Sequence, residues 1–239
     1  MSREEARKKI IFALDVETRA EAERWVTLLT GHVGLFKVGK QLFTACGPDI
    51  VRMIRERGGE VFLDLKYHDN PSTVAMATVE AARLGATLCN LHALGGFEMM
   101  AATRAAVDRE CGGGARPKVL AVTILTSSTE ETLKGVGIDL PLPEMVVKLA
   151  KLAKSAGIDG VVASPLEVAL IREACGDEFL IVTPGVRPSF AAVNDQKRIM
   201  TPAEAVRAGA DYLVIGRPIA AASDPVAACE AIIDEIVIS

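Results

Sequence analysis

The chain has 239 residues, of which 50% are hydrophobic and 24% charged, so it is long enough to bury a large core as one domain. Its formal net charge is only -4, which excludes the strong positive field that attracts nucleic acids and anionic membrane surfaces. We therefore expect no nucleic-acid and no membrane partner.

The cysteines and the N-terminus indicate a cytoplasmic protein. Five cysteines, at positions 46, 89, 111, 175 and 229, are scattered without a C-x-x-C pair, which favours reduced packing residues over a disulfide framework or a zinc site. The N-terminal stretch MSREEARKKI is charged, and the longest apolar runs are only as long as strands, so we expect no signal peptide and no spanning helix.

Eight short apolar or β-branched runs predict strands. In chain order they are KIIFALD (9–15), GLFKVG (34–39), EVFLDLK (60–66), TLCNLHA (87–93), KVLAVTIL (118–125), GVVAS (160–164), FLIVTPG (179–185) and YLVIGR (212–217). Their nearly continuous hydrophobicity is typical of parallel strands that are buried on both faces.

Segments with apolar residues at helical spacing lie between the strands, at 19–30, 48–58, 71–85, 143–157 and 201–209. Several end on a left-handed glycine stop before the next strand, in RERGGEVFL, ARLGATLCN, KSAGIDGVV and VRAGADYLV. The repeated unit predicts an α/β fold, a single-domain (β/α)8 TIM barrel over residues 1–239 with its active site at the carboxyl ends of the strands. A doubly wound open sheet is the alternative.

Three polar segments are candidates for flexible loops. Residues 126–143 and 185–200 follow predicted strands, where loops build active sites in a barrel. Residues 110–117 lie between a helix and the next strand. In a barrel, loops of this kind lie on the face that contributes to stability and not to the active site.

The third predicted strand ends in DLKYHDN, which places Asp64 and Lys66 two residues apart and therefore on one side of the strand. At the carboxyl end of a barrel strand, that side is the mouth of the barrel. A carboxylate beside an ammonium favours the charged form of both, so Lys66 could serve as a positioned acid. A structural ion pair is the alternative.

Two further charged residues belong to predicted strands on the same face. Lys37 lies in the second strand between apolar neighbours, and Asp15 ends the first strand. A functional reading places both at the barrel mouth. The alternatives are a snorkelling lysine for Lys37 and a helix N-cap for Asp15.

The last two predicted strands are followed by residues suited to a phosphate. Gly216 and Arg217 follow the eighth strand, and Arg187 follows the seventh, ahead of a long loop that carries Gln196. Phosphate commonly binds to these loops of a barrel, where glycine exposes backbone N–H groups and arginine supplies several donors. A loop of this length indicates a lid or a ligand clamp. A plain turn glycine and a surface arginine are the alternatives for Gly216 and Arg217.

These segments, taken together, resemble one known family. FALDV, FKVG, DLKYHDNPST, AVTILTSS, TPGVRP, Gln196 and VIGRP occur in the order and spacing of the orotidine 5′-phosphate decarboxylases, particularly the bacterial ones. The resemblance covers nearly the whole chain. The D-x-K-x-x-D signature also resembles related sugar-phosphate decarboxylases and aldolases, but HDNP and the phosphate set favour the orotidine branch.

The resemblance implies decarboxylation of orotidine 5′-monophosphate to UMP, the last step of pyrimidine synthesis, without a metal or an organic cofactor. It implies a network of alternating charges with Lys66 as the proton donor, made by Lys37, Asp64, Lys66 and Asp69. It also implies a homodimer with two shared active sites, because Asp69 and Thr73 correspond to residues that reach into the neighbouring subunit's site.

The remaining correspondences concern the substrate. Asp15 matches a ligand of the ribose hydroxyls, and Thr126 and Ser127 lie where the pyrimidine edge is read, with Ser128 as an open alternative. Four residues match the phosphate end and its lid: Arg187, Gln196, Gly216 and Arg217.

Two other functions stay open at this point. One is a magnesium-dependent sugar-phosphate decarboxylase or aldolase that uses the same Asp64 and Lys66. The other is a non-catalytic barrel that binds a nucleotide phosphate.

Overall fold

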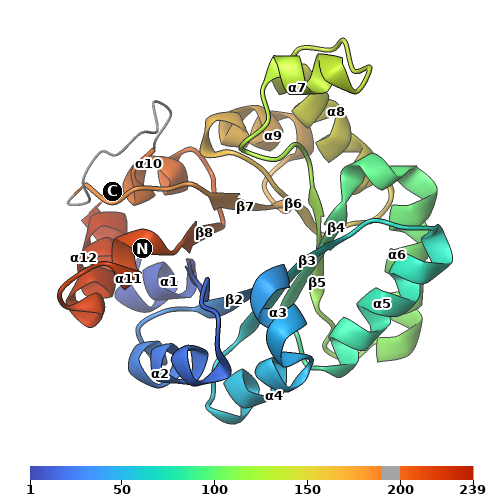
Figure 1. The fold of residues 1–239 in the computed structure, drawn as a ribbon. Helices are drawn as coiled ribbons and strands as arrows, with labels where there is room; N and C mark the ends of the chain where they lie inside the picture. The colour runs from blue at the N-terminus through green and yellow to red at the C-terminus, as the bar shows by residue number, and fades with distance from the viewer. Residues whose placement is uncertain (190–199, 239) are drawn as a thin grey trace.

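The computed structural model describes residues 1–189 and 200–238, which form a closed barrel of eight parallel strands with helices around it (Figure 1). The strands are β1 (Ile10–Ala13), β2 (Leu35–Gly39), β3 (Val61–Tyr67), β4 (Leu88–His92), β5 (Lys118–Val122), β6 (Gly160–Val162), β7 (Leu180–Pro184) and β8 (Tyr212–Ile215). Each strand pairs with the next, and β8 pairs with β1. All eight predicted strands and the closed barrel are therefore confirmed, and the open sheet is wrong.

Helices follow the strands and cover the outside of the barrel. The α-helices are α1 (Arg3–Lys8), α2 (Arg19–Leu29), α3 (Lys40–Cys46), α4 (Asp49–Glu56), α5 (Pro71–Arg83), α6 (Gly96–Cys111), α7 (Glu130–Gly135), α8 (Leu142–Ser155), α9 (Val168–Cys175), α10 (Pro202–Arg207), α11 (Arg217–Ala220) and α12 (Pro225–Ile238). Two short 3₁₀ turns, η1 (Ala93–Gly95) and η2 (Pro165–Glu167), precede α6 and α9. Within the described residues, no helix has the length and apolar character needed to cross a bilayer.

The strands separate two apolar cores. The barrel interior holds a small cluster, made by Ile11, Leu35, Phe62, Leu88, Leu120 and Val182. The larger cluster lies between the strands and the helices and includes Leu63 and Leu91. Because successive side chains of a strand point to opposite faces, Asp64 shares the inward side with Phe62.

Local signals in the sequence explain most helix ends. The four predicted glycine stops have the positive φ angles of left-handed caps, at Gly58 (79°), Gly85 (79°), Gly157 (79°) and Gly209 (109°). Helix α2 begins with a capping box between Thr18 and Glu21, so the N-cap alternative for Asp15 is wrong.

The segment 126–143 is more ordered than the flexible loop expected from its sequence. Helix α7 lies inside it, and Thr129 caps that helix by accepting the backbone N–H of Thr132. The polar composition of the segment concealed this short helix, which has only one buried residue, Leu133.

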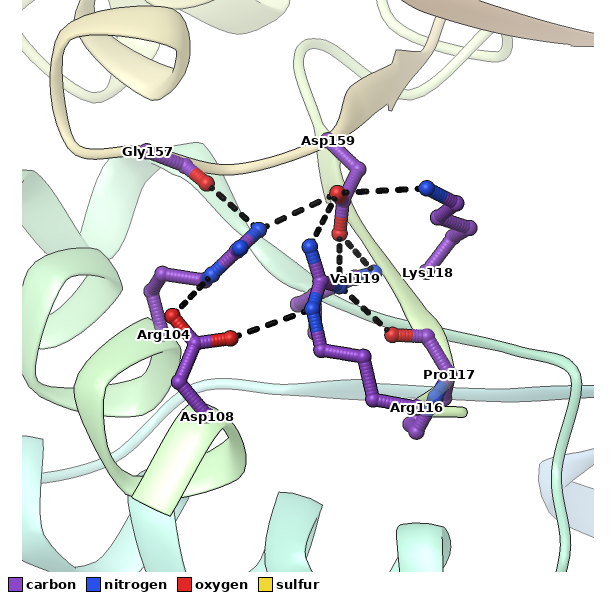
Figure 2. Close-up of polar contacts among 8 residues, drawn as sticks. All are labelled: Arg104, Asp108, Arg116, Pro117, Lys118, Val119, Gly157 and Asp159. Carbon is purple, nitrogen blue, oxygen red and sulfur yellow. Dashed lines mark hydrogen bonds and ion pairs between the residues drawn. The ribbon is translucent and has the colours of Figure 1, made fainter. Parts of the chain in front are cut away.

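A charged network ties the amino-terminal ends of β5 and β6 together, on the face opposite the barrel mouth (Figure 2). Arg116 donates two hydrogen bonds of 2.7 Å to Asp159, whose carboxylate also accepts the Val119 N–H at 2.8 Å. Arg104 on α6 adds a bond of 3.1 Å to Asp159 and pairs with Asp108 at 2.7 Å. Burial opposes ionisation, but Arg116 and the Val119 N–H together lower the pKa of Asp159 below its ordinary value.

Candidate active site

A cavity of about 380 Å³ lies at the carboxyl ends of the strands. Apolar side chains make much of its wall, among them Phe62, Val122, Ile124, Val162, Val186 and Val214. Eight of the residues predicted for the site line this cavity: Asp15, Lys37, Asp64, Lys66, Thr126, Arg187, Gly216 and Arg217. Segments that span most of the chain therefore bring these residues to one cavity.

Four of the lining residues form a row of alternating charges. The Lys66 Nζ lies 2.5 Å from Asp64 Oδ1, and Lys37 Nζ lies 3.7 Å from Asp64 Oδ2. Lys37 also donates a hydrogen bond of 2.9 Å to Asp15 Oδ1. The side chains of Asp64 and Lys37 are only 11% and 12% exposed, so their interactions are less screened than those of surface charges.

The β3 segment that carries Asp64 and Lys66 is irregular. Its register with β4 shifts between Leu63 and Tyr67, and Lys66 between them has a positive φ of 53°. The buried side chain of Asn90 on β4 accepts the Lys66 backbone N–H at 2.8 Å and donates to Asp64 Oδ1 at 2.6 Å. Sequence reasoning missed Asn90, although its inward position two residues after Leu88 was a usable signal.

A pair of arginines lines the cavity after the ends of β7 and β8. Arg187 follows β7, and Arg217 follows β8 at the start of the short helix α11. Burial and the positive charge of Arg217 both lower the pKa of Arg187. Because the two positive charges disfavour each other, an anion bound between them would be stabilised.

Gly216 lets the chain pass close to β1 beside these arginines. A Cβ at this position would lie 3.2 Å from Ala13 Cβ and 3.7 Å from Asp15 Oδ2, which leaves little room for a side chain. A glycine here therefore lets the loop after β8 pack closely against the end of β1.

The other predicted site residues do not line the cavity. Asp69 and Ser127 are exposed, and Thr73 is exposed in the first turn of α5. Asp69 Oδ1 accepts the Asn70 N–H at 2.6 Å. Gln196 lies outside the described residues.

A pair of histidines near this site was not expected from the sequence. The rings of His68 and His92 lie 5.7 Å apart, after β3 and at the end of β4. Burial lowers the pKa of His92, and the charges of His68, Lys40 and Lys66 lower it further. The sequence did contain a signal for this pair, because His68 directly follows one strand and His92 ends the next.

The fold and the charged cavity together define a class: a parallel-barrel enzyme with lysine and carboxylate groups at the carboxyl ends of its strands. Among the described residues, no group of three or more His, Cys, Asp or Glu side chains gathers as metal ligands would.

Comparison with known proteins gives the family within this class. Residues 8–232 match the family described as "Orotidine 5'-phosphate decarboxylase / HUMPS family". The orotidine 5′-phosphate decarboxylases of Geobacter sp. (strain M21) and Citrifermentans bemidjiense are 72% and 71% identical over 238 residues, 99% of each chain. The crystal structure of orotidine 5′-phosphate decarboxylase from Lactobacillus acidophilus matches with a TM-score of 0.85 and 40% identity, over 95% of this chain and 98% of that one. The chain therefore belongs to the orotidine 5′-phosphate decarboxylase family.

Proposed function

We propose that this protein decarboxylates orotidine 5′-monophosphate to UMP and that Lys66 protonates C6 of the pyrimidine. The observation that carries the proposal is the largely buried row of Lys37, Asp64 and Lys66 at the cavity, with the Lys66 ammonium 2.5 Å from the Asp64 carboxylate. Two relatives named as orotidine 5′-phosphate decarboxylases are about 70% identical to this chain over nearly their whole length. This similarity favours the same reaction here.

The reaction explains why an ammonium is needed at this position. When the bond between C6 and the carboxylate breaks, its electron pair stays on C6, where the ring delocalises it poorly. A fixed ammonium stabilises this charge strongly in an enclosed site of low effective dielectric. Lys66 then transfers one N–H proton to C6, and the neutral amine regains a proton from solvent after the product leaves.

Asp64 and Lys37 prepare Lys66 for this role. Asp64 holds the Lys66 ammonium in place and favours its charged form. Lys37 lies between Asp64 and Asp15, so it reduces the repulsion between the two carboxylates. In this proposal Asp15 binds the ribose hydroxyls, and Thr126 meets the pyrimidine edge.

The phosphate of the substrate would bind after the ends of β7 and β8. Arg187, Arg217 and the backbone at Gly216 supply donors there, and Gln196 belongs to the proposed lid. This group is remote from C6, so its binding energy would serve to close the site and exclude water rather than act on the breaking bond.

We also propose that the enzyme is a homodimer with shared sites. Asp69 and Thr73 are exposed and lie outside the cavity of their own chain, as residues that serve a neighbouring site must. In the dimer, Asp69 of one subunit would complete the charge row of the other.

The cytoplasm is the expected location of this protein.

The reaction is proposed to need no metal, because ammonium groups already face the Asp15 and Asp64 carboxylates. The test is the loss of orotate absorbance when purified protein meets orotidine 5′-monophosphate in the presence of EDTA. Rapid loss is expected. Absence of turnover, followed by magnesium-dependent activity on sugar phosphates, would support the rival enzyme. Tight nucleotide binding without turnover would support a binding protein.

A further inference from the structure

The end of β3 contains a bulge that isolates one residue of β4. Leu63 pairs with Cys89, and the next pair is Tyr67 with Leu91. Residues 64, 65 and 66 of β3 therefore stand opposite a single residue of β4, Asn90. A bulge of this kind interrupts the backbone ladder and leaves N–H groups that need other partners.

The Asn90 side chain replaces the interrupted ladder. Its Oδ1 accepts the Lys66 backbone N–H at 2.8 Å, and its Nδ2 donates to Asp64 Oδ1 at 2.6 Å. The orientation of the amide is determined by its partners, because an N–H needs an acceptor and a carboxylate needs a donor. Asn90 is only 1% exposed, so loss of either bond would leave a buried polar group without that partner.

The backbone that Asn90 holds is unusual. Among the residues that the structure describes, Lys66 is the one non-glycine residue with a positive φ. L-residues adopt this conformation infrequently, and it persists only where the surroundings enforce it. The conformation sets where the Lys66 side chain starts, and therefore where its ammonium lies in the cavity.

Asn90 is not part of the cavity wall, so it would act through its two partners and not on the substrate. We propose that Asn90 is a positioning residue for the decarboxylation. Its oxygen holds the left-handed backbone of Lys66, and its nitrogen fixes the Asp64 carboxylate that orients the Lys66 ammonium. This inference rests on the proposed function of Lys66.

The first test is Asn90→Ala, assayed on the full-length enzyme. Because the ammonium would lose its alignment with C6, kcat should fall about 10- to 100-fold, while KM stays within about threefold. Active sites are counted by UMP binding, so that kcat refers to folded molecules. The matched control is Thr103→Ala, which removes a different buried hydrogen bond, from Thr103 Oγ1 to the Met99 carbonyl at 2.8 Å. This control should lower the melting temperature without changing kcat.

A second variant gives a readout that a purely structural role would not move. In Asn90→Asp, one oxygen can still accept the Lys66 N–H, but the other faces Asp64, so the two carboxyl groups would compete for a proton. The titratable groups around this pair are Lys66, Lys37 and the partly buried His92. Activity should therefore recover toward acid pH, where the introduced carboxyl group is protonated and can donate to Asp64. The alkaline limb of the kcat profile should move to lower pH.

The outcomes separate this inference from the proposed function. An inactive wild-type enzyme would overturn both. If the wild type is active and Asn90→Ala has the same kcat as the wild type, only the role of Asn90 is overturned. If Asn90→Ala does not fold, the Asn90→Asp profile decides: a shifted alkaline limb supports the role, and wild-type kcat with an unshifted profile overturns it.

Discussion

Lys66 combines an infrequent backbone conformation with an ammonium group held inside a cavity, and both features serve one proposed step. We expect Lys66→Ala to lower kcat by at least about 10³-fold, because it removes both the stabilising charge and the proton donor. UMP binding should stay within about tenfold of wild type, since the proposed phosphate contacts remain. Stopped-flow absorbance and calorimetry measure the two quantities. Lys148→Ala, at an exposed position on α8, is the control and should behave like wild type.

Arg217 tests the proposed phosphate end of the cavity. We expect Arg217→Ala to lower kcat/KM about 10- to 100-fold, because a charged hydrogen bond contributes about 1.5–3 kcal/mol and each 1.4 kcal/mol is tenfold. Free phosphite should increase the turnover of the nucleoside orotidine by the wild type, and this activation should weaken in the variant. The exposed Arg207 on α10 provides the control substitution, Arg207→Ala. If phosphite has no effect on the wild type, the proposed use of phosphate binding is wrong.

Individual site residues were predictable where their signal was local. Asp64 and Lys66 share a strand, and Gly216 and Arg217 directly follow one, so strand periodicity was enough to place them in the mouth of a barrel. The inward position of Asn90 could be read from strand periodicity, but its role was not predicted, because that role depends on the bulge across the β3–β4 pair. A register shift is a property of two strands and leaves no regular pattern in either one.

At the scale of the elements, continuous apolar strands and glycine stops were strong signals. All eight strands were found because parallel barrel strands are buried on both faces and read as unbroken apolar runs. Helix α7 was missed inside a polar segment, since a six-residue helix with one buried residue has almost no hydrophobic period to detect. Its capping box at Thr129 was the signal that remained in the sequence.

The hydrogen-bond network around Asp159 joins α6 and the amino-terminal ends of β5 and β6, on the face opposite the cavity. We expect Asp159→Asn to lower the free energy of unfolding by about 2–3 kcal/mol at neutral pH, because Arg116 and the Val119 N–H lose a buried acceptor. Asp108→Asn should cost less than about 1 kcal/mol, because Asp108 is 46% exposed. Urea unfolding measures both, and kcat should stay unchanged since the network lies on the opposite face.

The same carboxylate gives the stability a defined pH dependence. The folded-state pKa of Asp159 lies below its ordinary value of 3.8, so its stabilising contribution is fully present above that value. It is lost as the pH falls from there through the lower folded-state pKa. The difference in stability between wild type and Asp159→Asn should therefore narrow below about pH 4. A constant difference down to acid unfolding would contradict this account.

At the scale of the whole molecule, the proposed dimer predicts complementation between two defective chains. Asp69→Ala and Lys66→Ala should each be strongly impaired as homodimers. In a mixed dimer, one site would combine Lys66 of one subunit with the partner's Asp69, and the other site would lack both. Random exchange of equal amounts makes half of the dimers mixed, so about a quarter of the wild-type activity should return. A mixture that exchanges subunits but stays inactive would show that each site is self-contained.

The pairing of β8 with β1 has a consequence for biosynthesis. Asp15 follows the first strand of the barrel and Arg217 follows the last, and they face one cavity only after Ile10, Ile11 and Phe12 have paired with Leu213, Val214 and Ile215. A chain still on the ribosome that lacks β8 therefore has no complete cavity for the proposed nucleotide. The substrate cannot assist the early stages of folding, and its binding energy favours only the finished, closed molecule.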